Sequence, residues 1–237
     1  MNRIEKRFVI PNIITGANML LGFLSIIMSF QGDLLKASWL IVMAMVADGL
    51  DGKTARALDG FSEFGKEFDS FCDAVSFGMA PAILIYSILM EQVALKELII
   101  PLSFLYLLCG VLRLVKFNII TEASKDKADF IGMPIPTAAG LVASYNIFSN
   151  AVWGELVQIN LFLILAFFVS ILMVSAITFK SISKTFRVLG SKGLLALLIL
   201  VAVFAKYLLF PFGLSYFLVN SFNFIKEKRF ISKEEVS

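Results

Sequence analysis

Long apolar runs, each near the length that crosses a bilayer, recur along this chain of 237 residues. A helix of about 20 apolar residues spans the hydrocarbon core, and lipid admits only helices and closed barrels because every backbone polar group must be paired internally. The chain is 59% hydrophobic, contains 24 Phe and has a mean hydropathy of +0.87, more apolar side chain than a soluble domain of this length needs. We therefore predict an all-α, polytopic membrane helix bundle.

The apolar periodicity predicts about eight transmembrane segments. We expect them at residues 14–30, 36–58, 67–90, 98–120, 136–153, 160–179, 193–209 and 211–225. Residues 1–10 are basic and amphipathic, and we expect them to lie on the membrane surface ahead of the first segment. Pro211 separates the last two segments, which could alternatively form one kinked segment with a re-entrant end.

Positive charge is distributed asymmetrically across these segments. Of the 21 Lys and Arg residues, Lys36, Lys96 and Lys206 fall on one side and the other 18 share the opposite side. Because basic residues concentrate in cytoplasmic loops, we expect that side, with both termini, to face the cytoplasm. The acidic hairpin between the second and third segments lies on the same side.

The residue types present restrict the chemistry. The chain has no histidine, which removes the usual general base and a common metal ligand. Cys72 and Cys109 lie in apolar segments with no pairing pattern, and we expect them to be small buried hydrophobic residues. Acid–base chemistry would fall to carboxylates, Lys, Tyr or Cys.

Two pairs of aspartates stand at the ends of the second and third segments. Asp48 and Asp51 are three residues apart and Asp69 and Asp73 are four apart, so each pair projects from one face of its helix. The glycine-containing stretch ALDGFSEFG between them indicates a tight turn. The four carboxylates are therefore expected to converge at the cytoplasmic end of an antiparallel helix pair, where they need a cationic partner.

Oxygen ligands without imidazole or thiolate suit Mg²⁺ or Mn²⁺, so the four aspartates are candidate ligands of one or two divalent ions. Gly52 and Ala55 adjoin the aspartates and leave room for a ligand against the backbone. Arg56, one turn beyond Asp51, is placed to reach a phosphate. The other acidic residues of the hairpin are expected to be ordinary solvated charges; they are Asp59, Glu63 and Glu67.

This hairpin resembles the signature of the CDP-alcohol phosphatidyltransferase family at all eight fixed positions, which are Asp48, Asp51, Gly52, Ala55, Arg56, Gly65, Asp69 and Asp73. The resemblance implies a six-helix membrane bundle, usually dimeric, that displaces CMP from a CDP-linked lipid with an alcohol. It implies that Asp48, Asp51 and Asp69 hold metal and that Asp73 is the base. Gly52, Ala55 and Arg56, together with Gly65, would line the CDP-lipid site, and no nucleic-acid partner is expected.

Two further stretches bear on the substrates. PNIITGAN (Pro11–Asn18) is similar to the start of the family's first helix, where Asn12 and Thr15 contact the nucleotide; both could alternatively be capping residues of that helix. CGVLRLVKFNII carries Arg113, Lys116 and Asn118 as candidate acceptor-binding residues. Arg113 and Lys116 share a face, and snorkelling to the interface would account for Lys116. Arg113 is embedded among apolar residues, so we expect it to face the cavity and bind a phosphate or carboxylate.

LRLVKFN and GMPIP, the latter within FIGMPIPTAAG (Phe130–Gly140), resemble the integral-membrane phosphatidylserine synthase branch of the family, although GMPIP could be a plain helix-start turn. The likeness covers roughly residues 8–180, so we divide the chain into a family core at 1–180 and two additional helices with a cytoplasmic tail at 181–237. It implies a homodimer in the cell membrane that transfers a phosphatidyl group from CDP-diacylglycerol, or CDP-archaeol, to L-serine and releases CMP.

Two other functions remain open from the sequence. A family member acting on glycerol 3-phosphate or inositol phosphate should need more cations than Arg113 and Lys116 to hold the acceptor's phosphate. A cation transporter should carry acidic residues near the bilayer midplane on several helices. The position of the four aspartates on one hairpin near one interface favours the enzyme.

Overall fold

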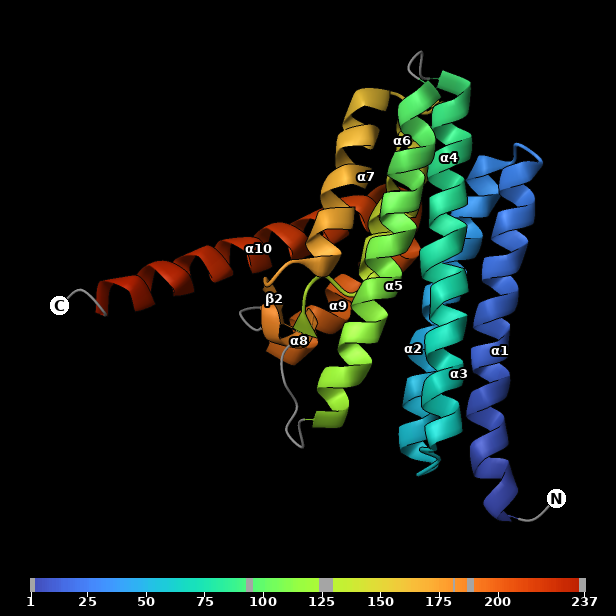
Figure 1. Ribbon diagram of the computed structural model, residues 1–237, viewed down its shortest axis with the longest axis vertical. Coiled ribbons are helices and arrows are strands. Elements are labelled where there is room, and N and C mark those ends of the chain that lie inside the picture. The colour runs from blue at the N-terminus through green and yellow to red at the C-terminus, as the bar shows by residue number, and fades with distance from the viewer. Residues whose placement is uncertain (1–2, 93–95, 124–129, 181, 187–189, 235–237) are drawn as a thin grey trace.

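The computed structural model describes residues 3–92, 96–123, 130–180, 182–186 and 190–234. The helices are α1 (Arg3–Phe30), α2 (Leu34–Ala57), α3 (Glu63–Asp73), α4 (Ala80–Gln92), α5 (Ile99–Ala123), α6 (Ile135–Trp153), α7 (Ile159–Val174), α8 (Ile182–Thr185), α9 (Gly190–Val203) and α10 (Ala205–Glu234). A π-helical segment, η1 (Ala74–Met79), joins α3 to α4, and a 3-10 turn, η2 (Lys96–Leu98), precedes α5. Figure 1 shows α1 to α7 running along the long axis of one bundle.

The prediction of a helical membrane protein is confirmed. Three stretches of helix are long and apolar enough to cross a bilayer, at Arg7–Phe30, Glu63–Glu91 and Lys96–Ile119. Two shorter apolar helices, Ile159–Val174 and Lys192–Val203, accompany them. The first five predicted segments each fall on a helix whose bounds differ by a few residues, apart from an earlier start of α1. That helix begins at Arg3, so the lead segment is continuous with the first span.

The sixth predicted segment, 160–179, is too long at its end. Helix α7 stops at Val174, and β2 (Thr178–Phe179) pairs antiparallel with β1 (Phe130–Ile131). The turn depends on Gly132, whose φ of +83° suits glycine and whose Cβ, if present, would collide with the Met173 carbonyl oxygen. The "GMPIP" stretch is thereby attached to the end of α7.

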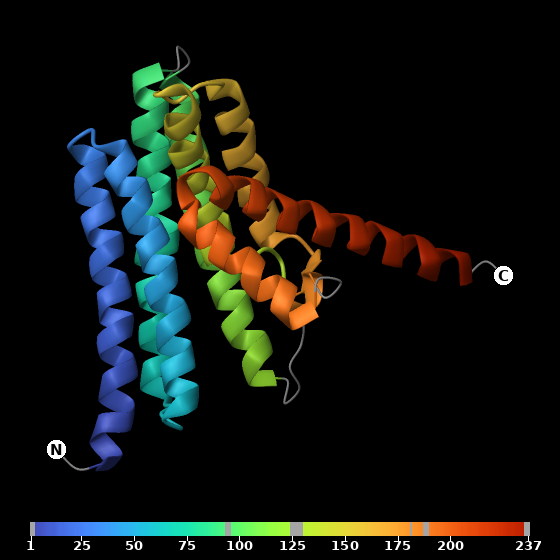
Figure 2. The same cartoon turned by 180° about the vertical axis from the view of Figure 1, so that it is seen from behind.

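The boundary between the last two predicted segments was misplaced at Pro211. The break lies at Phe204, between α9 and α10, and Pro211 is inside α10. Helix α9 has 14 residues, about 21 Å at 1.5 Å per residue, and is shorter than a bilayer core of about 30 Å. Helix α10 leaves the bundle at a steep angle (Figures 1 and 2). That 181–237 supplies two membrane spans stays a prediction.

Local signals start the two helices that carry the aspartates. The Asp33 side chain caps α2, because its Oδ1 accepts a hydrogen bond from the Lys36 amide at 3.2 Å. Its Oδ2 forms an ion pair with Lys36 Nζ at 2.6 Å. Lys36 also holds the pKa of the Asp33 carboxyl below its ordinary value through these bonds. Ser62 caps α3, its Oγ accepting from the Gly65 amide at 3.0 Å. One capping residue therefore sets the start of each helix, Asp33 for α2 and Ser62 for α3.

The core lies around α6, which is buried along most of Ile135–Ile147. Small residues such as Ala138, Ala139 and Ala143 let neighbouring backbones approach closely, which is how membrane helices pack. Helices α2 and α10 pack against this helix.

The π-helical segment marks where α1, α3–α4 and α5 meet. Ser76 Oγ donates to the Asn18 carbonyl oxygen at 2.9 Å, and Tyr106 Oη donates to the Phe77 carbonyl oxygen at 3.2 Å. Gly22 allows α1 to come this close, because a Cβ there would lie 2.5 Å from Ser76 Cα. Such π-bulges are frequent at functional sites, and this one directly follows Asp73.

We expect Gly22→Ala to destabilise the fold by about 1–3 kcal/mol, the usual cost of overpacking, because the new methyl group meets backbone. Gly16→Ala in the same helix is the matched control, since a Cβ at Gly16 has nothing within 4 Å. Thermal unfolding of the two purified variants in detergent measures the difference. Equal midpoints for both variants would show that α1 can move away from η1 without cost.

Candidate active site

The ends of α2 and α3 bring three carboxylates together. Asp48, Asp51 and Asp69 each offer an oxygen, and these oxygens lie within 4.8 Å of one another. The intervening loop passes close under α1, since a Cβ on Gly60 would collide with the carbonyl oxygen of Arg7. The prediction that aspartates from the two helices converge is therefore confirmed for these three.

Asp73 lies one turn beyond Asp69 on α3 and is outside the group of three. It is 8% exposed, and its Oδ1 accepts a hydrogen bond from Asn18 Nδ2 at 3.3 Å. Its environment therefore differs from that of the cluster: a neutral amide holds it inside the bundle. Asn18 was not among the residues selected from the sequence.

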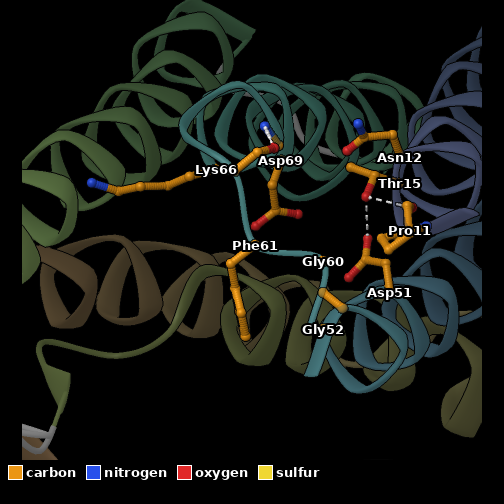
Figure 3. A pocket seen from close by; sticks show the side chains of 12 residues that line it. Pro11, Asn12, Thr15, Asp51, Gly52, Gly60, Phe61, Lys66 and Asp69 are labelled. Carbon is orange, nitrogen blue, oxygen red and sulfur yellow. Dashed lines mark hydrogen bonds between the residues drawn. The ribbon is translucent and has the colours of Figure 1, made fainter. Parts of the chain in front are cut away.

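A cavity of about 200 Å³ opens beside the cluster, between α1, the end of α2 and the start of α3. Figure 3 shows Asp51 and Asp69 facing each other across it, with Asn12 and Thr15 on the α1 side. Seven of its lining residues were predicted site residues; they are Asn12, Thr15, Asp51, Gly52, Ala55, Gly65 and Asp69. Five were not, namely Pro11, Gly60, Phe61, Ser62 and Lys66. Asp48, Asp73, Arg56, Arg113, Lys116 and Asn118 do not line it.

The alternative that Asn12 and Thr15 are helix caps is wrong, because α1 begins at Arg3 and both lie inside it. Thr15 Oγ1 is placed to donate to Asp51 Oδ2, at 2.8 Å, and to the Pro11 carbonyl oxygen, at 3.1 Å. A buried threonine thus joins α1 to the acidic cluster. The Asn12 Oδ1 lies 3.2 Å from the position of a Cβ on Gly65, so glycine gives the amide its place.

The α2 face beside Asp51 is open. A Cβ on Gly52 would meet no atom within 4 Å except Arg56 Nη2, at 3.9 Å. The Arg56 side chain is exposed and lies over this glycine. The space for a ligand against the α2 backbone, expected from the sequence, is therefore present, and the Arg56 guanidinium lies next to it.

The three α5 candidates are separated by the fold. Arg113 is 6% exposed, its guanidinium carbon lies 5.1 Å from the centre of the Phe117 ring, and its Nε has no hydrogen-bond partner among the described residues. Lys116 is exposed, although it lies only three residues from the buried Arg113 and on a neighbouring part of the same helix face. Residues three apart differ by about 60° around a helix, enough to place one inside the bundle and one outside. Asn118 Nδ2 donates to Ser70 Oγ at 3.0 Å.

One pattern in the sequence could have identified Asn18. Thr15, Asn18 and Gly22 recur at three- and four-residue spacing, which places them on one face of α1. All three contact the acidic hairpin or the π-segment that follows it. A polar and small stripe in an apolar helix indicates an internal face of a membrane bundle.

The cluster fits a hard divalent cation. Its donors are carboxylate oxygens, which suit Mg²⁺ or Mn²⁺. Asp69 Oδ1 is buried without a hydrogen-bond partner among the described residues. Three carboxylates this close repel one another unless a cation lies between them. Asp48, Asp51 and Asp69 are the residues that could hold it.

Comparison with known proteins gives a consistent result. The chain is 35% identical over 202 residues to the CDP-diacylglycerol–serine O-phosphatidyltransferase of Helicobacter pylori, covering 85% of this chain and 81% of that protein. It is 37% identical over 182 residues to the archaetidylserine synthase of Methanothermobacter thermautotrophicus, covering 76% and 73%. The chain is 42% identical over 129 residues to the CDP-diacylglycerol–serine O-phosphatidyltransferase of Bacillus subtilis, covering 54% of this chain and 70% of that protein.

The sequence profile of CDP-alcohol phosphatidyltransferases matches residues 8–172, from the start of α1 almost to the end of α7. This range contains the aspartates, the cavity and Arg113, and it leaves α8, α9 and α10 outside. With the site formed inside the matched region and relatives aligned over most of their length, the chain belongs to the CDP-alcohol phosphatidyltransferase family.

Proposed function

We propose that this protein transfers the phosphatidyl group of CDP-diacylglycerol to the hydroxyl of L-serine, giving phosphatidylserine and CMP. The carrying observation is that three aspartates cluster beside a cavity that two of them, Asp51 and Asp69, line, inside the region shared with enzymes named for serine transfer. CDP-archaeol is an equally suitable donor, because an archaetidylserine synthase is among the relatives. The three aspartates lie on one hairpin, which supports an enzyme over a cation transporter.

In the proposed reaction the serine hydroxyl oxygen attacks the phosphorus that carries the diacylglycerol and forms a new P–O bond. The bond from that phosphorus to the bridging oxygen breaks, and CMP leaves with its electron pair. Asp73 takes the hydroxyl proton, since the chain has no histidine to act as base. The hydrogen bond from Asn18 holds the Asp73 carboxylate for this role.

Asp48, Asp51 and Asp69 would hold the divalent metal, one or two Mg²⁺ or Mn²⁺ ions, with Asp73 as a further candidate ligand. When bound, the metal neutralises the pyrophosphate and the charge that develops on the departing CMP. Thr15 fixes the Asp51 carboxylate through its hydrogen bond. The cytidine part would occupy the cavity beside Gly52, Ala55 and Gly65, with Asn12 and Arg56 at its edges.

Filling the space beside Gly52 tests the nucleotide site. Gly52→Leu is expected to leave the fold intact, because no protein atom lies close to the new Cβ, and to lower CDP-lipid affinity about 5- to 150-fold. Gly49→Leu is the control, since Gly49 lies on the same helix and a Cβ there meets nothing within 4 Å. Binding titrations with CDP-diacylglycerol compare the two. Equal affinities would mean that the nucleotide binds elsewhere.

An acceptor screen tests the function itself. Purified protein receives CDP-diacylglycerol with Mg²⁺ or Mn²⁺, and CMP release is measured with L-serine, glycerol 3-phosphate, inositol phosphate or no acceptor. Serine-dependent release is expected, and CDP-archaeol is run in parallel. Release with a phosphorylated acceptor alone would assign the other branch of the family. No release with any acceptor, together with metal flux in proteoliposomes, would favour a transporter.

We place the protein in the cytoplasmic membrane as a multi-pass homodimer, with its active site and both termini facing the cytoplasm. The charge asymmetry of the loops supports this orientation. Tags at either terminus should therefore be protected from protease in sealed right-side-out vesicles and cleaved in inverted ones. A C-terminal tag cleaved from outside would indicate an odd number of spans and require a new assignment of α9 and α10.

A further inference from the structure

Asn18 is a buried amide with one half of its side chain unpaired. The residue is 0% exposed, and its main-chain carbonyl accepts a hydrogen bond from Ser76 Oγ. A carboxylate can only accept hydrogen bonds, so the NH₂ group has to face Asp73 Oδ1 and the orientation of the amide is determined. Its Oδ1 consequently points away from Asp73 and has no partner among the described residues. A buried acceptor without a donor costs free energy, so a ligand that supplies a donor to this oxygen would be stabilised.

Arg113 presents the opposite case. Its side chain is buried in the bundle, and Nε is a donor without a partner among the described residues. Arg113 is in neither of the ion pairs Arg7–Asp59 and Lys36–Asp33, and it has no carboxylate oxygen within 4.0 Å among the described residues. Helix α5 lies along η1 and α3, where Tyr106 donates to the Phe77 carbonyl oxygen and Asn118 donates to Ser70, and Arg113 lies on α5 between these two contacts. A buried guanidinium in an apolar helix needs an anion with good geometry.

Both unpaired groups belong to the surroundings of Asp73. Asn18 contacts Asp73 from α1, and Arg113 lies on α5 between the side chains that contact Ser70 and Phe77, which come before and after Asp73 in the chain. Asp69, which lines the cavity, lies one turn before Asp73 on α3, so Asp73 lies one helical turn further along α3 than the cavity lining. A buried amide with an unpaired oxygen and a buried guanidinium thus lie near the carboxylate that we propose as the base.

We propose that Asn18 and Arg113 recognise the acceptor as a zwitterionic amino acid: Asn18 Oδ1 accepts a hydrogen bond from the ammonium group, and Arg113 binds the carboxylate. The inference rests on the proposed function. Serine carries its ammonium and carboxylate on the carbon next to the one that bears the hydroxyl, so all three groups can be held while the hydroxyl meets Asp73. Glycerol 3-phosphate and inositol phosphate have no ammonium group for the Asn18 oxygen.

The test compares three acceptors that differ by one group. L-serine has both charged groups, 3-hydroxypropionate lacks the ammonium and ethanolamine lacks the carboxylate. For each protein, kcat/KM with CDP-diacylglycerol is measured for all three, and ratios to serine are taken. The ratio removes any general loss of turnover that follows from moving Asp73. Wild-type enzyme is expected to prefer serine over each analogue by about 10- to 100-fold, the value of one hydrogen bond to a charged group.

Asn18→Ala should erase the preference over 3-hydroxypropionate and keep the preference over ethanolamine. Arg113→Gln should do the reverse, and Arg113→Lys should restore part of what Arg113→Gln loses. The KM for serine should rise at least tenfold in Asn18→Ala and Arg113→Gln, while the KM for CDP-diacylglycerol stays within twofold. Ile13→Ala on α1 and Leu112→Ala on α5, both outward-facing, are the controls and should leave every ratio unchanged.

Three results would overturn the inference. Unchanged ratios in both variants would make Asn18 and Arg113 structural. A change in kcat alone would make Asn18 a positioning residue for Asp73 and nothing more. If a variant does not fold, wild-type enzyme decides: equal use of serine and 3-hydroxypropionate excludes the Asn18 contact, and equal use of serine and ethanolamine excludes the Arg113 contact. Absence of serine-dependent CMP release in wild type would instead reject the proposed function.

Discussion

Asp73→Asn is expected to lower turnover by a factor of about 10²–10⁴, the usual cost of removing a general base, while CDP-lipid and metal remain bound. Asparagine keeps the size of the side chain and one oxygen, which can still accept the hydrogen bond from Asn18. It cannot take a proton at neutral pH. Because Asp73 lies outside the group of three clustered carboxylates, its loss should leave the metal ligands in place.

Asp51→Asn is the comparison variant, because it distinguishes the loss of a metal ligand from the loss of a base. Asp51 belongs to the cluster and accepts from Thr15, so its replacement removes a ligand charge and should weaken metal affinity and with it CDP-lipid binding. Calorimetry or a thermal-shift titration with CDP-lipid separates the two variants. If Asp73→Asn loses CDP-lipid affinity as severely as Asp51→Asn, Asp73 is a metal ligand. The base then has to be sought at Tyr86, Lys116 or a metal-bound water.

Removal of divalent metal should abolish activity, to below about a thousandth of the starting rate, because Lewis-acid charge stabilisation is worth several kcal/mol. Mg²⁺, Mn²⁺ or both should restore it once the chelator is saturated. The reason lies in the cluster of Asp48, Asp51 and Asp69, whose donors are all carboxylate oxygens.

A readout independent of activity accompanies the chelation experiment. Metal binding should raise the unfolding temperature of wild-type protein by relieving repulsion among the three carboxylates. Asp69→Asn should show little of this stabilisation, since the cluster loses one of its charges. Full turnover in excess chelator, or equal stabilisation of both proteins by metal, would contradict a metal site at these residues.

Much of the fold and the cluster followed from the sequence because the signals are local. Apolar runs of bilayer length do not depend on which helix lies beside them, and the first five segments accordingly fall on α1 to α6, with α3 and α4 forming one span. The aspartate spacings of three and four residues place each pair on one helix face through backbone geometry alone. One short hairpin then brings Asp48, Asp51 and Asp69 together.

Breaks in the helices were less predictable. Pro211 is a strong local signal for a break, yet the chain turns at Phe204 and continues as helix through the proline. The end of α7 at Val174 depends on pairing with a strand more than 40 residues earlier in the chain, Phe130–Ile131. Local propensity contains no information about such a partner.

The sequence by itself determined the membrane class, the family signature and the acidic hairpin, since each is encoded in contiguous residues. Tertiary structure alone decided which polar groups meet: Thr15 with Asp51 across 36 residues and Asn18 with Asp73 across 55. It also buried Arg113 and exposed Lys116 three residues later. The physical reason is that each side chain of a helix points about 100° around the axis from the one before it. Which direction faces the site depends on the helices packed around it.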